Sequence, residues 1–200
     1  MYPYVFRKLL SRESTALIGH LLRLTAKDRQ RRFLGAVSEA SVREYATRID
    51  WAHTLVIGCF VEGTLRGVAE VHMTDERLPI LCEVALTVER AWQDQGVGTE
   101  LLRRAMLAAR NRGTPGLHLH CLSDNYAIQH VAGKFGAQFA TKVGESHATL
   151  PASPLSFWSL YEEGIQETLG WWQILLDPRS YGQASPEEDL RTALSAEIEK

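Results

Sequence analysis

The sequence predicts an α/β (α+β) fold in which a mixed, largely antiparallel central sheet is flanked by helices. Apolar runs typical of strands occupy the middle of the chain, a helical period of 3.6 residues follows them, and strands then alternate with helices. With 200 residues, 45% of them hydrophobic, the chain can bury a core of its own. We expect one domain over residues 1–150 and a helical C-terminal extension over residues 151–200.

Charge and composition point away from several classes of partner. The formal net charge is −2 and the isoelectric point is near 6.4, which gives no general attraction to nucleic acid or to anionic membranes. No apolar run approaches the roughly 20 residues that span a bilayer, and the first residues lack the apolar block of a secretory signal. We expect a cytoplasmic protein that binds neither nucleic acid nor membrane.

The three cysteines, Cys59, Cys82 and Cys121, are far apart and lie in apolar segments. None belongs to a Cys-x-x-Cys pair or to a Cys/His cluster, which are the arrangements that bind zinc. We therefore predict reduced thiols in the core and no metal site.

The first fifty residues predict helices. Ser11 or Ser14 can cap the first helix, and the segment 38–49 offers a second start. The first helix carries an apolar stripe that consists of Leu17, Ile18, Leu21 and Leu22. The basic segment between the two helices, residues 26–33, is interpreted as a solvated turn.

Three consecutive segments have the composition of strands, and they cover residues 54–61, 64–73 and 80–88. The dipeptide Glu62-Gly63 is typical of a tight turn, and a polar stretch that ends at Pro79 separates the second and third segments. This order predicts an antiparallel meander.

A helical period begins after the third strand and stops at Gly113. Its apolar face consists of Val97, Leu101, Leu102, Ala105, Met106 and Ala109. A strand over residues 117–122, a helix over 124–135 and a last strand over 137–143 complete the pattern. The alternation predicts a right-handed crossover and some parallel pairing.

The C-terminal extension carries an apolar helical stripe, and Pro178 is expected to end that helix. The stripe consists of Tyr161, Ile165, Leu169, Trp172 and Leu176. We expect it to pack on the body of the protein or on a second subunit, which would form a homodimer. Residues 185–200 predict a short charged helix.

Gly96 and Gly98 lie between a strand that ends near Val88 and the long helix. The first N–H groups of a helix have no partner within it, and glycines let a phosphate come close to them. The alternative is that Gly96 is only a turn and Gly98 only a packing contact. A P-loop is excluded because no Gly-Lys-Ser/Thr follows, and a dinucleotide fingerprint because Leu101 replaces its third glycine.

With Gln93 ahead of the two glycines, the sequence resembles the GNAT superfamily of acyl-CoA-dependent N-acetyltransferases, in which an Arg/Gln-x-x-Gly-x-Gly/Ala loop holds the CoA pyrophosphate. The resemblance covers roughly residues 55–143 and implies a GNAT-like fold. Glu83, which precedes Gln93 by ten residues, is similar in position to the glutamate of bacterial protein-lysine acetyltransferase domains.

The resemblance implies acetyl-CoA as cosubstrate, and no metal. Backbone groups of Leu86, Thr87 and Val88 would meet the pantetheine arm. The loop around the pyrophosphate would consist of Gln93, Asp94, Gln95, Gly96, Val97, Gly98 and Thr99. Asn125 would lie beside the thiol end.

Glu83 is the candidate catalytic residue, because an amine must lose a proton before it attacks a thioester. It is an ionisable group on an otherwise apolar strand, where burial would favour its neutral form. The alternative is an ion pair with an arginine at the sheet surface. The general acid is unassigned because Ala132 stands where many relatives carry a tyrosine. The nearby candidates are Tyr126, Cys121, His118 and His120, and direct departure of the thiolate is equally compatible.

We therefore expect an N-acetyltransferase that moves an acetyl group from acetyl-CoA to a primary amine, of a protein lysine or a small molecule, by direct transfer in a ternary complex. Two alternatives stay open. One is an inactive acyl-CoA-binding sensor or interaction module, which Ala132 favours. The other is a partner-binding domain that has lost the cofactor.

Overall fold

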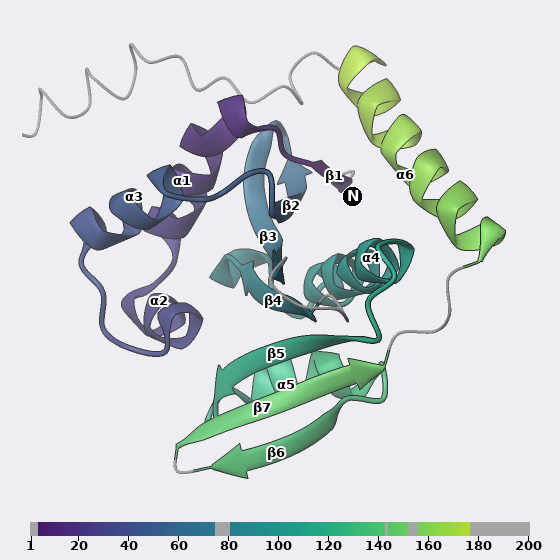
Figure 1. The fold of residues 1–200 in the computed structure, drawn as a ribbon. Coiled ribbons are helices and arrows are strands. Elements are labelled where there is room, and N and C mark those ends of the chain that lie inside the picture. The colour runs from purple at the N-terminus through teal and green to yellow at the C-terminus, as the bar shows by residue number, and fades with distance from the viewer. Residues whose placement is uncertain (1–3, 75–80, 143, 152–155, 177–200) are drawn as a thin grey trace, which may run out of the picture.

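The computed structural model describes residues 4–74, 81–142, 144–151 and 156–176, which form a twisted mixed sheet with helices on both faces (Figure 1). Within these ranges the strand order is β1-β2-β3-β4-β5-β7-β6. The strands are β1 Val5–Lys8, β2 Thr54–Val61, β3 Thr64–Thr74, β4 Leu81–Val88, β5 Gly116–Leu122, β6 Gln138–Lys142 and β7 Glu145–Pro151. Neighbours are antiparallel except for β4 and β5, which are parallel. The predicted fold class is confirmed.

Two groups of helices cover the two faces of the sheet. The helices are α1 Ser14–Arg23, α2 Ala26–Phe33, α3 Glu39–Thr47, α4 Val97–Asn111, α5 Tyr126–Gly133 and α6 Phe157–Leu176, with short 3-10 turns at Ser11–Glu13 and Arg90–Trp92. Because successive strand residues point to opposite sides, Val56 packs with α1 and α3 in one apolar cluster, whereas Ile57 packs with α4 and α5 in the other. The cleft described below lies beside β4 and β5, where α2 of one group and α5 of the other both line it.

The cysteines lie inside these clusters. Cys59, Cys82 and Cys121 are buried and form no disulfide, which confirms their prediction as core thiols. Burial raises the pKa of Cys59 to about 12. Among the described residues, no group of three or more His, Cys, Asp or Glu side chains is arranged to hold a metal ion.

The central meander agrees with the sequence prediction. The segments expected over residues 54–61, 64–73 and 80–88 correspond to β2, β3 and β4. Glu62 and Gly63 both have positive φ, at 50° and 75°, so the tight turn between β2 and β3 is confirmed. The helix expected after the third strand is α4, and it crosses over to the parallel strand β5.

Three elements differ from the sequence prediction. The segment 26–33 is helix α2 and not a turn, because Thr25 accepts a hydrogen bond from the Asp28 N–H at 3.1 Å and caps it. Strand β1 occupies part of the region expected to be helical. Strand β7 inserts between β5 and β6, antiparallel to both. Its inward residues Ser146 and Ala148 are small, and this weakens the apolar alternation that identifies a strand.

Strands β4 and β5 separate after a short paired region, and this positions the site. Their pairing runs from Cys82–Leu117 to Val84–Leu119. Beyond Val84, β4 still pairs with β3 on its other side, so an edge of the strand is left facing a gap. Gly67 of β3 lets the start of α4 pack close to the sheet, because a Cβ there would lie 3.1 Å from the Val97 and Leu101 side chains.

The C-terminal helix α6 packs against β1 and α4, but with the unexpected side. Tyr161, Ile165, Leu169 and Trp172 of the predicted stripe are exposed. The stripe therefore does not pack on the body of its own chain, and its packing on a second subunit, the other expectation, stays a prediction. The Leu176 side chain, Pro178 and the segment 185–200 lie outside what the structure describes. Of the helices that it does describe, none is long and apolar enough to cross a membrane.

Candidate active site

A cleft of about 560 Å³ opens where β4 and β5 separate, a size typical of ligand sites. Four parts of the chain line it. They are Leu24 at the end of α1 and α2 with Asp28, Arg31 and Arg32; β4 with Val84, Ala85, Leu86, Thr87 and Val88; the loop and start of α4 with Gln93, Asp94, Gly96, Gly98 and Thr99; and β5, α5 and the residues that cap α5 with Leu119, His120, Cys121, Asn125, Tyr126, Ala127, Ile128, His130, Val131 and Lys134. Most of the predicted cofactor residues therefore meet in one cavity.

The glycine loop turns the N-terminus of α4 toward the cleft. Asp94 and Gly96 have positive φ of 57° and 82°, and Gly96 is the N-cap of α4. The first hydrogen bond within the helix runs from the Glu100 N–H to the Gly96 carbonyl at 3.0 Å, so the preceding N–H groups have no acceptor within the helix. Together with the helix dipole they form a site suited to an anionic diphosphate.

Gly98 leaves space for a ligand. A Cβ on Gly98 would lie 3.7 Å from Val88 and 3.8 Å from Leu86, which is ordinary contact. Packing against the protein therefore does not require a glycine here, contrary to the alternative interpretation of this residue. A larger side chain would extend into the cleft that Gly98 lines. The cavity thus fits the group that the sequence resemblance implies.

Three predicted loop residues take other positions. The Gln93 amide donates to the Val88 carbonyl at 2.9 Å, so it ties the loop to the end of β4 and occupies a backbone acceptor expected for pantetheine. Gln95 points to solvent, where it donates to the Ala91 carbonyl at 2.8 Å. Val97 is buried in the core and anchors α4. Neither Gln95 nor Val97 lines the cleft.

Glu83 lies beside the cleft but is not buried. It pairs in register with His72 of β3 and His118 of β5, and its side chain is exposed. The expectation that Glu83 is buried is therefore wrong, because the described helices do not cover its side chain. The described part of the chain contains no arginine ion-paired with Glu83. By strand alternation Glu83 shares its face with Ala85 and Thr87, which line the cleft.

The candidates for a general acid divide into two groups. His120, Cys121 and Tyr126 line the cleft, whereas His118 does not. Burial raises the pKa of Cys121 above its usual range, which keeps this thiol protonated. Tyr126 is 74% exposed. Ala132 is fully buried in the core beside α4.

Helix α2 forms a wall that the sequence interpretation missed. Arg32 donates to Glu70 of β3 at 2.7 Å and to the Tyr45 hydroxyl at 2.6 Å. Tyr45 donates in turn to the second Glu70 oxygen at 2.7 Å. Burial opposes the charge on Glu70, but Arg32 and these hydrogen bonds outweigh it and hold the pKa of Glu70 below its usual range. The cap sequence from Thr25 to Asp28 is the signal that could have identified this helix.

A second buried network lies behind Thr87. His20 of α1 contacts the Thr87 hydroxyl at 2.9 Å and the Glu89 carboxylate at 3.1 Å. Arg23 and Arg66 each donate to Glu89 at 2.9 Å. Burial lowers the pKa of His20 despite the neighbouring carboxylate, so the ring stays neutral and its orientation is fixed by both partners. The network holds α1 against the cleft strand.

This network predicts that stability falls as the pH is lowered through about 6.5, the usual histidine pKa. Burial lowers the pKa of both His20 and His72. The unfolded chain therefore takes up protons that the folded chain does not, and folding loses free energy as the pH falls. Urea unfolding between about pH 5.5 and pH 7.5 should show this slope. His20→Gln should reduce it, whereas replacing the exposed His130 with glutamine should not.

A mixed sheet that opens between two parallel strands, with a glycine loop and a helix N-terminus at the opening, defines an acyltransferase of the GNAT type. The model of the acetyltransferase (GNAT) family matches residues 21–137, more than half of the chain, and the chain belongs to this family. It is therefore a GNAT-type N-acetyltransferase, and acetyl-CoA is the acyl donor that this family uses.

Solved structures agree with this fold at low sequence identity. The GNAT domain of S. lividans PAT has a TM-score of 0.63 and 18% identity, covering 73% of this chain and 89% of that one. The ribosomal-protein-S18-alanine N-acetyltransferase from Escherichia coli has a TM-score of 0.59 and 18% identity, covering 78% and 97%. A putative acetyltransferase from Salmonella typhimurium, solved with acetyl-CoA, has a TM-score of 0.56 and 18% identity, covering 77% and 96%.

Proposed function

We propose that the protein transfers an acetyl group from acetyl-CoA directly to a primary amine, of a protein lysine or a small molecule, in a ternary complex. The observation that carries the proposal is the cleft in which the free edge of β4, the glycine loop and the N-terminus of α4 meet. Pantetheine amides can pair with the free strand edge like an added strand. The diphosphate can then meet the α4 N-terminus without a dedicated lysine.

Glu83 is the proposed base or water-orienting group. Its strand neighbours on the same face, Ala85 and Thr87, line the cleft, and the exposed carboxylate is open to an incoming amine. It would take a proton from the ammonium group, directly or through one water, so that the neutral nitrogen can attack the thioester carbon. The leaving thiolate would then collect a proton from water or from a cleft side chain such as Tyr126.

The first test is acetyl-CoA binding by Gly98→Val. The protein packs no closer than 3.7 Å to the added Cβ, so the fold should survive while valine blocks the cleft. In calorimetry we expect at least a tenfold loss of acetyl-CoA affinity, since blocked space removes contacts worth about 1.4 kcal/mol or more. Gly133→Val, on a helix position with open space around it, is the matched control. Equal affinity in both variants would contradict the proposed cleft.

Turnover separates the enzyme from an inactive acyl-CoA sensor. We expect CoA release from acetyl-CoA to accelerate with at least one member of a panel of small amines and lysine peptides. Binding without acceleration by any amine would favour the sensor. The supporting observation is that Ala132 is buried in the core, at the position where the resemblance implies a tyrosine as the general acid.

A further inference from the structure

Helix α6 turns its charged side chains toward the body of the protein. Glu163 forms an ion pair with Lys8 at 2.8 Å, and Glu167 contacts the same lysine. Glu162 forms an ion pair with Arg103 of α4 at 2.6 Å. These three glutamates are all the charged residues of the helix. Glu163 and Glu167 are partly buried on its inner side, whereas Glu162 is half exposed and its charge is paired with Arg103.

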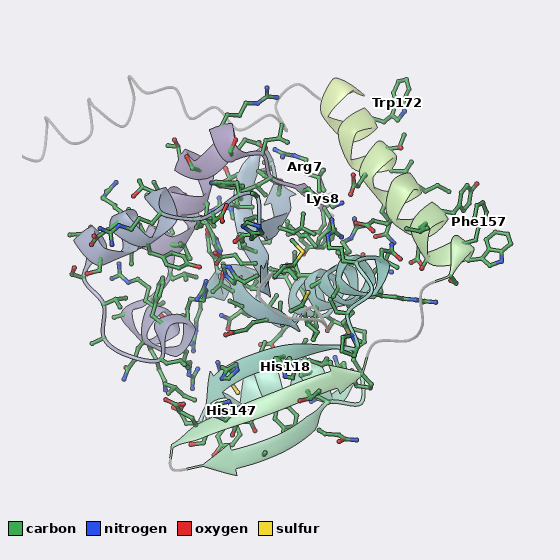
Figure 2. All side chains as sticks on the ribbon, viewed as in Figure 1. Arg7, Lys8, His118, His147, Phe157 and Trp172 are labelled. Carbon is green, nitrogen blue, oxygen red and sulfur yellow. The ribbon has the colours of Figure 1, made fainter. Side chains whose placement is uncertain are left out.

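The outer side of α6 is apolar and exposed. We call it the α6 face; its residues are Phe157 (77% exposed), Trp158 (74%), Leu160 (48%), Tyr161 (56%), Ile165 (40%), Leu169 (58%) and Trp172 (56%). Phe157 and Trp172, at the two ends, point away from the sheet and from α4 (Figure 2). A surface helix ordinarily does the reverse and buries its apolar stripe. An exposed patch of this kind marks an interaction site.

The spacing along the α6 face suits contact with another helix. Trp158, Tyr161, Ile165, Leu169 and Trp172 follow one another at intervals of three or four residues, which places them along one side of the helix. Twenty helical residues extend for about 30 Å. The face is therefore a continuous apolar ridge, long enough to pack along a helix of a second subunit.

We propose that the α6 face binds the α6 face of a second copy of this chain, forming a homodimer around a two-fold axis. Its four aromatic side chains alone expose on the order of 400–650 Å² if a fully exposed aromatic side chain has about 150–250 Å² of surface. The three aliphatic side chains bring the face close to the roughly 800 Å² that each partner buries in a stable interface. One face thus supplies the area that a dimer needs.

The charge distribution favours a second copy over other occupants. Residues 157–176 contain no lysine or arginine, whereas a helix that lies on a membrane surface normally carries basic residues on its polar side. An acidic or basic partner would find no opposite charge on this face. Two identical uncharged faces can meet without repulsion, because the glutamates of each copy are already paired with its own body.

The proposed dimer leaves the cleft open. None of the residues that line the cleft belongs to α6, and α6 packs mainly on β1 and α4 (Figure 1). The inference therefore does not depend on the proposed acetyl transfer. Acetyl-CoA binding serves as an independent measure of folding in the variants below.

The test is the mass in solution of the full chain, by sedimentation over a wide concentration range. We expect twice the chain mass of 22.4 kDa. Leu169→Glu and Ile165→Glu each place two unpaired charges in the interface and should weaken dimerisation by about 100-fold or more. Phe139→Glu changes another exposed apolar residue, on edge strand β6, and should leave the dimer intact. Both glutamate variants should retain acetyl-CoA affinity.

Disulfide cross-linking gives a second readout. The native cysteines are buried, so Ile165→Cys, Tyr161→Cys and Leu169→Cys each supply one accessible thiol. A two-fold contact along α6 should let at least one of them form a disulfide-linked dimer under mild oxidation, even if a glutamate variant fails to fold. A monomeric wild-type chain, or a dimer that persists in both glutamate variants and forms no such disulfide, would overturn the proposal.

Discussion

Glu83→Gln should lower the rate of acetyl transfer by about 100-fold or more, the range typical of a lost general base. The amide keeps the size of the side chain but cannot accept the ammonium proton. Acetyl-CoA affinity should change by less than about twofold, because Glu83 lies outside the group of residues that line the cleft and an exposed surface substitution perturbs its surroundings little. Steady-state rates with an accepted amine, together with calorimetry, measure the two effects separately.

The pH dependence identifies what Glu83 does. In the wild type the rate should fall on the acid side as the base becomes protonated, and this limb should disappear or move in Glu83→Gln. Glu83→Asp should restore part of the rate. Glu44→Gln, which changes an exposed carboxylate on α3, is the matched control. An unchanged pH profile in Glu83→Gln would remove this residue from the mechanism.

Arg32→Met should lower the free energy of unfolding by about 3–5 kcal/mol, the usual cost of leaving one member of a buried ion pair without its partner. The side chains of Arg32 and Glu70 are only 9% and 0% exposed. Without Arg32, Glu70 must either keep an uncompensated charge or take up a proton. The same change should loosen α2, the wall of the cleft that carries Asp28 and Arg31. Urea unfolding near neutral pH provides the measurement.

Two further variants make this result specific. Arg43→Met removes an exposed arginine from α3 and should change the stability by less than about 0.5 kcal/mol. Adding Glu70→Gln to Arg32→Met should recover part of the loss, because the buried charge is gone and the amide can still bond to Tyr45. If Arg32→Met were as stable as the wild type, the Arg32–Glu70 pair would not hold α2 in place.

The features of the site that depend only on neighbouring residues could be predicted from the sequence. Gly96 adopts a positive φ and caps α4, and Gly98 lines the cleft, as a glycine loop between a strand and a helix requires. The same reasoning could not show that Gln93 bonds to the Val88 carbonyl or that Glu83 is exposed. The Gln93 bond depends on how the loop folds back onto the end of β4, and the exposure of Glu83 depends on which distant segments cover the strand. Periodicity within one segment predicts neither.

Long-range packing explains the other differences. Residues 26–33 are too polar to predict a helix that packs against the sheet. Arg32 pairs with Glu70 and donates to Tyr45, which belong to other elements. The α6 stripe was predicted from its spacing, and the spacing is present. Which side of the helix faces the body depends on Lys8 and Arg103, far away in the sequence.

The sequence by itself determined the meander β2–β4, the amphipathic helix α4 and the glycine loop, because side-chain period and backbone freedom are properties of neighbouring residues. Only the tertiary structure decided where β4 and β5 separate, which residues of the loop face the cleft, that β7 lies between β5 and β6, and that α6 turns its aromatic side outward. These features follow from pairing and burial between residues distant in the chain, and their free energies are set by partners that a local pattern does not contain.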